Sequence, residues 1–162
     1  MKICVLSDTH IPDRARELPP GLIEELKTAD MVIHAGDLVD PAVYKTLCEV
    51  CKDVRIVSGN MDPAELKNKF PDRRLIKAGR FTIGVVHGWG PPNHLMHIVK
   101  DVFKAEAPDI VIFGHSHQVC NTQDGKTLYF NPGSPTDNVF AAFKSFGIIE
   151  ITDTITARIV KL

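Results

Sequence analysis

The sequence has no long apolar run and no excess of charge of either sign. No segment approaches the roughly 20 apolar residues that a membrane-spanning helix needs, so we expect no membrane partner. The apolar stretch Ile3–Leu6 near the amino terminus is too short for the core of a signal peptide, so a cytoplasmic protein is expected. A formal net charge of -1 gives no field that attracts polyanions, and nucleic acid is not expected as a stable partner.

Cysteines are few and do not form an extended motif. Four are present, and without a secretory signal they are expected to be free thiols rather than a disulfide framework. Cys48 and Cys51 have the spacing of a redox or zinc pair, but no second pair accompanies them. Their place in an expected helix favours buried small residues over a metal site. Internal repeats and long linkers are also absent, so residues 1–162 are expected to form a single domain.

The sequence does contain an alternation of β-prone apolar runs and segments with helical spacing. The expected strands cover residues 2–6, 31–34, 54–57, 74–76, 81–86, 109–113, 119–122, 127–130, 145–151 and 154–160. The expected helices cover residues 22–26, 41–50 and 94–104. The early helices provide the crossovers that parallel strands require, whereas the later strands form mostly antiparallel pairs. The pattern predicts an α/β (α+β) fold, a four-layer α/β/β/α sandwich of two mixed sheets flanked by helices.

Metal-binding residue types follow five of these strands directly. They are Asp8 and His10, Asp37, Asn60, His87, and His115 and His117. In an open α/β sheet, the loops that leave the carboxyl ends of the strands converge on one edge, where such folds place their ligand sites. Carboxylate and imidazole are good ligands for divalent transition metals. The set is larger than one ion needs and fits two.

Five short motifs carry these residues in a fixed order. They are Asp8-Thr9-His10, Gly36-Asp37-Leu38-Val39-Asp40, Gly59-Asn60-Met61-Asp62, His87-Gly88 and Gly114-His115-Ser116-His117. With them, the chain resembles the calcineurin-like metallophosphoesterases, whose pattern is DxH, GDxxD, GN[HX][DE], H and GHxH, and most of all their compact single-domain YfcE-like branch. The resemblance extends to the turn Asn131-Pro132-Gly133-Ser134, which that branch also carries. It therefore covers essentially the whole chain and implies the metallophosphoesterase fold.

The resemblance also implies a role for each ligand. Asp8, His10, Asp37 and His117 would hold a first metal ion, and Asp37, Asn60, His87 and His115 a second, so that Asp37 bridges the two. Asp37 and Asn60 are accordingly the expected catalytic positions. Manganese is the expected metal, with iron, zinc, nickel and cobalt as alternatives.

The implied activity is that of a dinuclear metal-dependent phosphoesterase. A phosphodiesterase that uses a metal-bridging hydroxide for in-line attack on a small phosphodiester substrate is the expected form. The alternative is a protein-interaction scaffold, because a retromer-coat subunit has a similar fold with altered ligands. No expected ligand is replaced in this chain, which favours the enzyme. A homo-oligomer would be compatible with either function.

One position departs from the pattern of many relatives. The residue after the ligand Asn60 is Met61, where those relatives have a histidine that is thought to protonate the leaving group. A thioether cannot donate a proton, and general acid catalysis contributes about 10² to 10⁴-fold. The sequence therefore predicts weak turnover of alkyl phosphomonoesters and better turnover of diesters with good leaving groups.

The other polar and aromatic residues near the motifs have structural or functional roles that we predict as follows. Asp40 and Asp62 would either orient the ligand imidazoles or the backbone from behind, or cap a helix and a turn. His34 is expected to be a hydrogen-bonded core residue, and His94 and His97 to lie on a solvated or substrate-contacting helix face. Trp89 is expected at the rim of the site, where it would stack on a substrate ring or pack the loop. For Arg14 and Arg16, a surface role is favoured over contact with substrate phosphate.

Overall fold

The computed structural model describes residues 1–162 as ten strands and four helices. The strands are β1 (Lys2–Leu6), β2 (Met31–His34), β3 (Val54–Ile56), β4 (Arg73–Ala78), β5 (Phe81–Val86), β6 (Ile110–Ile112), β7 (Cys120–Asp124), β8 (Thr127–Asn131), β9 (Ser145–Ile151) and β10 (Ile155–Lys161). The helices are α1 (Pro20–Lys27), α2 (Pro41–Val50), α3 (Ala64–Lys69) and α4 (Pro92–Val102). None of the helices has both the length and the apolar character needed to span a bilayer.

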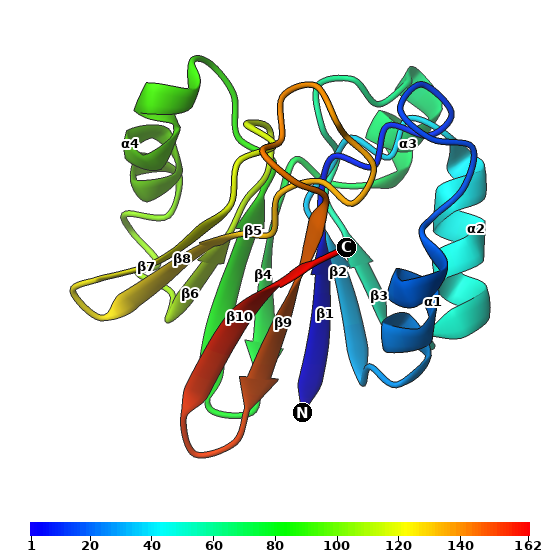
Figure 1. Ribbon diagram of the computed structural model, residues 1–162. Coiled ribbons are helices and arrows are strands. Elements are labelled where there is room, and N and C mark those ends of the chain that lie inside the picture. Colours follow the sequence, from blue (N-terminus) through cyan, green and yellow to red (C-terminus); the bar gives the residue numbers. More distant parts are fainter.

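The strands form two five-stranded mixed sheets. The first sheet has the order β10-β9-β1-β2-β3 and the second sheet the order β4-β5-β6-β8-β7. β1, β2 and β3 are parallel, as are β5, β6 and β8, whereas β4, β7, β9 and β10 pair antiparallel. Helices α1, α2 and α3 lie on one side of the pair of sheets and α4 on the other (Figure 1). The predicted four-layer sandwich is confirmed.

Three apolar cores fill the spaces between the four layers. The core between the two sheets and the core between the first sheet and its helices each contain 16 buried residues. A third core of 7 buried residues lies between the second sheet and α4. In β1, Ile3 and Val5 point into the core between the sheets, while Cys4 and Leu6 point toward the helices. Because side chains alternate along a strand, a strand covered on both faces is apolar throughout, as β1 is.

The structure corrects three details of the sequence analysis. Helix α3 was not predicted, because a six-residue helix with only Leu66 buried is too short to show helical periodicity. The turn between β7 and β8 lies one residue further along than expected, so that Asp124 is the last residue of β7. The prediction of two buried cysteines in α2 is wrong for Cys48, which is exposed on the outer face of the helix, and right for Cys51 at its end.

Candidate metal centre

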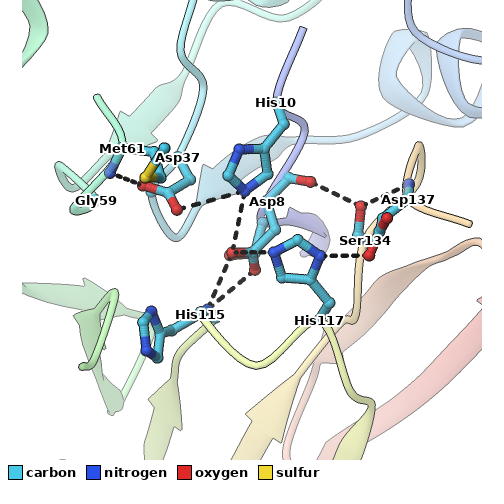
Figure 2. Close-up of polar contacts among 12 residues, drawn as sticks. Asp8, His10, Asp37, Gly59, Met61, His115, His117, Ser134 and Asp137 are labelled. Atoms are coloured by element: carbon cyan, nitrogen blue, oxygen red, sulfur yellow. Dashed lines mark hydrogen bonds and ion pairs between the residues drawn. The ribbon is translucent and has the colours of Figure 1, made fainter. Parts of the chain in front are cut away.

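Three of the expected ligands converge closely at one end of the sheets. Asp8 and His10 follow β1, and His117 follows β6. The His117 Nε2 atom lies 3.4 Å from Asp8 Oδ1, and the His10 Nε2 atom lies 3.9 Å from the same oxygen. All three residues are buried, and their ligand atoms lie within 4.8 Å of one another. We call Asp8, His10 and His117 the first ligand group; Figure 2 shows their side chains turned toward each other.

A second cluster adjoins the first. The ligand atoms of Asp8, Asp37 and His87 also lie within 4.8 Å of one another, and His87 Nε2 is 3.2 Å from Asp37 Oδ2. The Asn60 Oδ1 atom is 3.1 Å from His87 Nε2 and 2.9 Å from His115 Nδ1. We call Asp8, Asp37, Asn60, His87 and His115 the second ligand group.

Two carboxylates lie between these groups. Asp37 Oδ2 is 3.4 Å from His10 Nε2 as well as 3.2 Å from His87 Nε2, which suits the bridging position that the resemblance implies. Asp8 Oδ1 lies 3.9 Å from both of these nitrogens, so Asp8 belongs to both groups. The resemblance did not assign Asp8 this double position.

Hydrogen bonds on the far side of the rings orient two histidines of the second group. His87 Nδ1 donates to the carbonyl of Ala35 at 2.7 Å, which leaves Nε2 directed at Asp37. His115 Nε2 donates to the carbonyl of Gly90 at 3.0 Å, which leaves Nδ1 directed at Asn60. A histidine that donates from one ring nitrogen offers the lone pair of the other to a metal. Each ring therefore presents one nitrogen to the metal centre.

The carboxylate of Asp137 orients the ring of His117 in the same way. Its Oδ2 accepts a 2.6 Å hydrogen bond from His117 Nδ1, on the side of the ring opposite Asp8 (Figure 2). Asp137 is completely buried. Burial raises its pKa, but hydrogen bonds from the backbone N–H groups of Val139 and Phe140 and from His117 outweigh that effect and lower the pKa to about 2. Asp137 is thus a fixed anion behind His117, and it was not among the predicted site residues.

The His10 Nε2 atom has no hydrogen-bond partner, although it is buried. It faces Asp8 and Asp37, whose nearest oxygens are 3.9 and 3.4 Å away. Burial lowers the pKa of His10 and so favours its neutral, metal-binding form. A buried nitrogen without a partner, aimed at two carboxylates, fits a divalent cation. The donor set present therefore suits the metal ions that the resemblance implies.

The carboxylates of the centre attract positive charge. Burial raises the pKa of Asp8. Burial would lower the pKa of His87, but hydrogen bonding to Asp37 and the charges of Asp8 and Asp37 raise it to about 9. Burial would raise the pKa of Asp37, but hydrogen bonding and charge from His87 lower it. The carboxylates therefore favour a positive charge beside them, which a proton on His87 supplies and which a bound divalent cation would supply in its place.

Most of the ligands have an unusual backbone conformation. The φ angles are 56° at Asp8, 42° at His10, 60° at Asp37, 68° at His115 and 58° at His117. Positive φ is uncommon outside glycine, although aspartate and histidine adopt it more readily than most residues. Strain of this kind clusters at functional sites, where the surrounding structure maintains it. The conformation turns the chain sharply at each strand end and points the ligand side chains at a common centre.

Hydroxyl groups from the loop after β8 hold the first of these strained segments. Ser134 Oγ donates to the carbonyl of Asp8 at 2.7 Å, and Thr136 Oγ1 donates to the carbonyl of Thr9 at 2.6 Å. Both hydroxyl side chains are buried. The turn Asn131-Pro132-Gly133-Ser134, expected only as a mark of the family branch, therefore supports the backbone of the first ligand loop.

Asp62 ties two ligand loops together. Its carboxylate accepts hydrogen bonds from the backbone N–H groups of Asp37 at 3.1 Å, Val39 at 2.8 Å and Gly59 at 2.8 Å. A Cβ atom at Gly59 would lie 2.1 Å from Asp37 Oδ1, so only glycine permits this approach. Of the two roles expected for Asp62, the structure favours the orienting one, because its carboxylate fixes the backbone beside the ligands.

The remaining polar residues fall into structural and peripheral positions. Asp40 caps α2, because its carboxylate accepts a hydrogen bond from the N–H of Ala42 at 2.7 Å. Of the two roles expected for Asp40, the structure therefore shows the helix cap. His34 is a fully buried core residue, as predicted. Its Nδ1 accepts the N–H of Gly36 and its Nε2 contacts Thr9 Oγ1, both at 3.2 Å.

The outlying histidines and arginines also have clear positions. His94 and His97 are exposed on α4, and His97 Nε2 lies 3.3 Å from Asp101 Oδ2. Arg16 lines a separate small cavity. Arg14, for which a surface role was favoured, lines the cavity over the ligands, and its Nε lies 3.7 Å from Asp137 Oδ1.

The cavity over the ligands has a volume of about 580 Å³. Its floor contains ligands of both groups, and its walls include Arg14, Met61 and Phe140. Met61 is 56% exposed, and its backbone N–H donates to Asp37 Oδ1 at 2.7 Å. The position beside Asn60 is thus open to a substrate and carries a thioether.

Comparisons with known proteins agree with this geometry. Residues 1–154 match the family model of the calcineurin-like phosphoesterase superfamily domain. A probable metallophosphoesterase of Methanothermobacter thermautotrophicus is 35% identical over 84% of this chain and 78% of the relative.

Two solved structures extend the comparison. The Vps29 of Entamoeba histolytica in complex with zinc is 26% identical, with a TM-score of 0.78 over 99% of each chain. A structure described as a novel archaeal phosphodiesterase is 24% identical, with a TM-score of 0.80 over 100% of each chain, and shows the shared fold.

Proposed function

Because the chain belongs to the calcineurin-like phosphoesterase superfamily, we propose that it is a dinuclear metal-dependent phosphodiesterase. The observation that carries the proposal is the complete, oriented ligand set, with the unpartnered His10 Nε2 facing Asp8 and Asp37. The first ligand group together with Asp37 would hold one ion and the second group the other, so that Asp37 would serve both, with manganese as the expected metal. When bound, two such ions supply an activated water and stabilise the charge that develops in displacement at phosphorus.

The chain's own residues explain the preference for diesters. Arg14 lines the cavity with its side chain 30% exposed, so its guanidinium is available to a phosphate oxygen. Beside Asn60, the leaving group of a substrate would meet Met61, which has no proton to donate. A leaving group that departs as a stable anion needs no such proton, whereas an alkoxide does. Hydrolysis exchanges one P–O bond for another, and the proton of the attacking water passes to solvent.

The test is a comparison of substrates across metals. We expect the protein loaded with manganese to hydrolyse bis(p-nitrophenyl) phosphate, and to act weakly on alkyl phosphomonoesters such as glycerol phosphate. Iron, zinc, nickel and cobalt are tested in parallel, with the metal content of each sample measured. Absence of diester turnover with every metal, in samples that contain two ions per chain, would contradict the proposal. That result would instead favour a non-catalytic scaffold, the alternative that likeness to Vps29 supports.

A further inference from the structure

A second cavity adjoins the metal centre. Its volume is about 570 Å³, and its lining includes Asn60 and His87 of the second ligand group. Asn60 also lines the cavity over the ligands, so the two cavities meet at this residue. A phosphate held between the ligand groups could therefore extend one substituent into each cavity. A diester has two such substituents, whereas a monoester has one.

An exposed aromatic ring forms part of the wall of the second cavity. Trp89 lines it and is 54% exposed, which is unusual for so large an apolar side chain. The residue lies between Gly88 and Gly90, whose φ angles are 90° and 80°. These left-handed conformations suit glycine, and they turn the chain sharply on both sides of the ring. Because the carbonyl of Gly90 accepts the hydrogen bond of His115, the same loop both orients a ligand and carries the indole.

Lys67 supplies the cation of the lining that no carboxylate pairs with. Arg73 and Asp72 also line the cavity, but Arg73 is ion-paired with Glu106. The Lys67 Nζ atom donates to the backbone carbonyl of Asn60 at 2.8 Å, which places the ammonium group next to the metal centre. Asp72 accepts a hydrogen bond from Ser58 Oγ at 3.0 Å. The cavity thus combines an aromatic face with a cation near the phosphate position.

We propose that the second cavity binds a nucleoside substituent of the phosphodiester substrate, with the base stacked on Trp89 and the phosphate side toward Lys67. The inference rests on the proposed function and names the class of substrate for that site. Base stacking on an exposed aromatic side chain tolerates any base, because every base has a flat π face. The preference is therefore for a nucleotide over a sugar phosphate.

The experiment compares two ligands that differ only by the base. Adenosine 5′-monophosphate and ribose 5-phosphate are titrated against the metal-loaded protein, with affinities measured by calorimetry. Trp89 is the only tryptophan of the chain, so its fluorescence reports stacking directly, without any requirement for turnover. We expect the nucleotide to bind about tenfold more tightly and to quench the fluorescence, and the sugar phosphate to leave it unchanged.

Matched variants separate stacking from general damage. Trp89→Ala should abolish the tenfold preference, whereas Trp89→Phe should retain most of it. Leu75→Ala, which removes a 45% exposed side chain from β4, should leave both affinities unchanged. Equal affinities for the two ligands in the natural protein, or a preference that survives in Trp89→Ala, would overturn the inference. Diester turnover without nucleotide preference refutes this inference alone, and nucleotide binding without turnover refutes only the proposed hydrolase.

Discussion

The two ligand groups share Asp8, but they differ in the hydrogen-bond acceptors of their histidines and in the exposure of their ligands to solvent. In the first group, His117 is buried and hydrogen-bonded to the buried carboxylate of Asp137. In the second group, neutral backbone carbonyls accept from the histidines, His115 is partly exposed and Asn60 is exposed. We call the first group the closed half, because all of its ligands are buried. We call the second group the open half, because its ligands Asn60 and His115 reach the surface.

This difference indicates that one group binds its ion more tightly and the other is more accessible to substrate. A carboxylate behind a ligating histidine raises the basicity of the ring and fixes its orientation, so the first group should bind its ion more tightly. The second group contributes a neutral amide ligand and lies at the junction of both cavities. It is therefore the half that a substrate in either cavity would approach.

Asp8→Asn should have the largest effect, because Asp8 is the residue common to both groups. We expect loss of both ions and a fall in diester turnover of more than about 100-fold, beyond the range typical of outer-shell residues. Metal analysis and turnover of bis(p-nitrophenyl) phosphate measure the two effects. Asp13→Asn, the same change at an exposed residue of the same cavity, should alter neither. Two ions retained in Asp8→Asn would show that the groups do not depend on this carboxylate.

Met61→His probes the open half alone. An imidazole at this exposed position, beside Asn60, can protonate a departing alkoxide. We expect turnover of alkyl phosphomonoesters to rise about 10²-fold, while diesters with nitrophenolate leaving groups change little. Met61→Gln, which adds polarity without an acid, serves as the control. If the histidine variant gives no gain on poor leaving groups, the account of position 61 is wrong.

Asp137→Asn probes the closed half. With its oxygen in the place of Oδ2, the amide can still accept from His117 and from the N–H of Phe140. The bond from the N–H of Val139 to Oδ1 is lost, and so is the negative charge behind His117. We expect the tighter ion to bind about 10 to 100-fold more weakly and the weaker ion to be unaffected, as measured by calorimetric titration. Equal weakening of both ions would mean that Asp137 only maintains the loop.

His34 supports both halves, and its effect should be the smallest. Burial lowers its pKa to about 3 from 6.5, so below pH 6.5 the unfolded chain takes up a proton that the folded protein does not. The free energy of unfolding should therefore fall by about 1.5 kcal/mol between pH 6.5 and 5, at roughly 1.36 kcal/mol per pH unit. Denaturant unfolding of the natural protein and of His34→Gln measures this difference. The slope assigned to His34 should be absent from the variant, and an unchanged slope would contradict the assignment.

The sequence predicted the layered fold and the convergence of the ligands for the same reason. Apolar runs such as Ile3–Leu6 are fully buried strands, and a polar residue immediately after such a run lies at the sheet edge. Asp137 escaped prediction because it follows β8 in a long loop and meets His117 only through tertiary packing, 20 residues away. An aspartate shortly after the Ser134 turn was the available signal.

Other predictions failed where local pattern is weak. Helix α3 is too short to show a period. Cys48 lies on the exposed face of α2 because burial of that helix falls on Val43 and Leu47, one turn apart. The position of Arg14 over the ligands depends on the path of the loop after β1, which no periodicity describes.

The left-handed backbone at the ligands has a consequence for how this chain can evolve. A left-handed conformation costs a non-glycine residue on the order of 1 kcal/mol, so the five ligands that adopt it together oppose folding by roughly 5 kcal/mol. That is comparable to the whole stability of many domains. Glycine would relieve this strain, but it would also remove the side chains that form the metal centre. Selection for activity, rather than for stability, is what aspartate and histidine at these positions indicate.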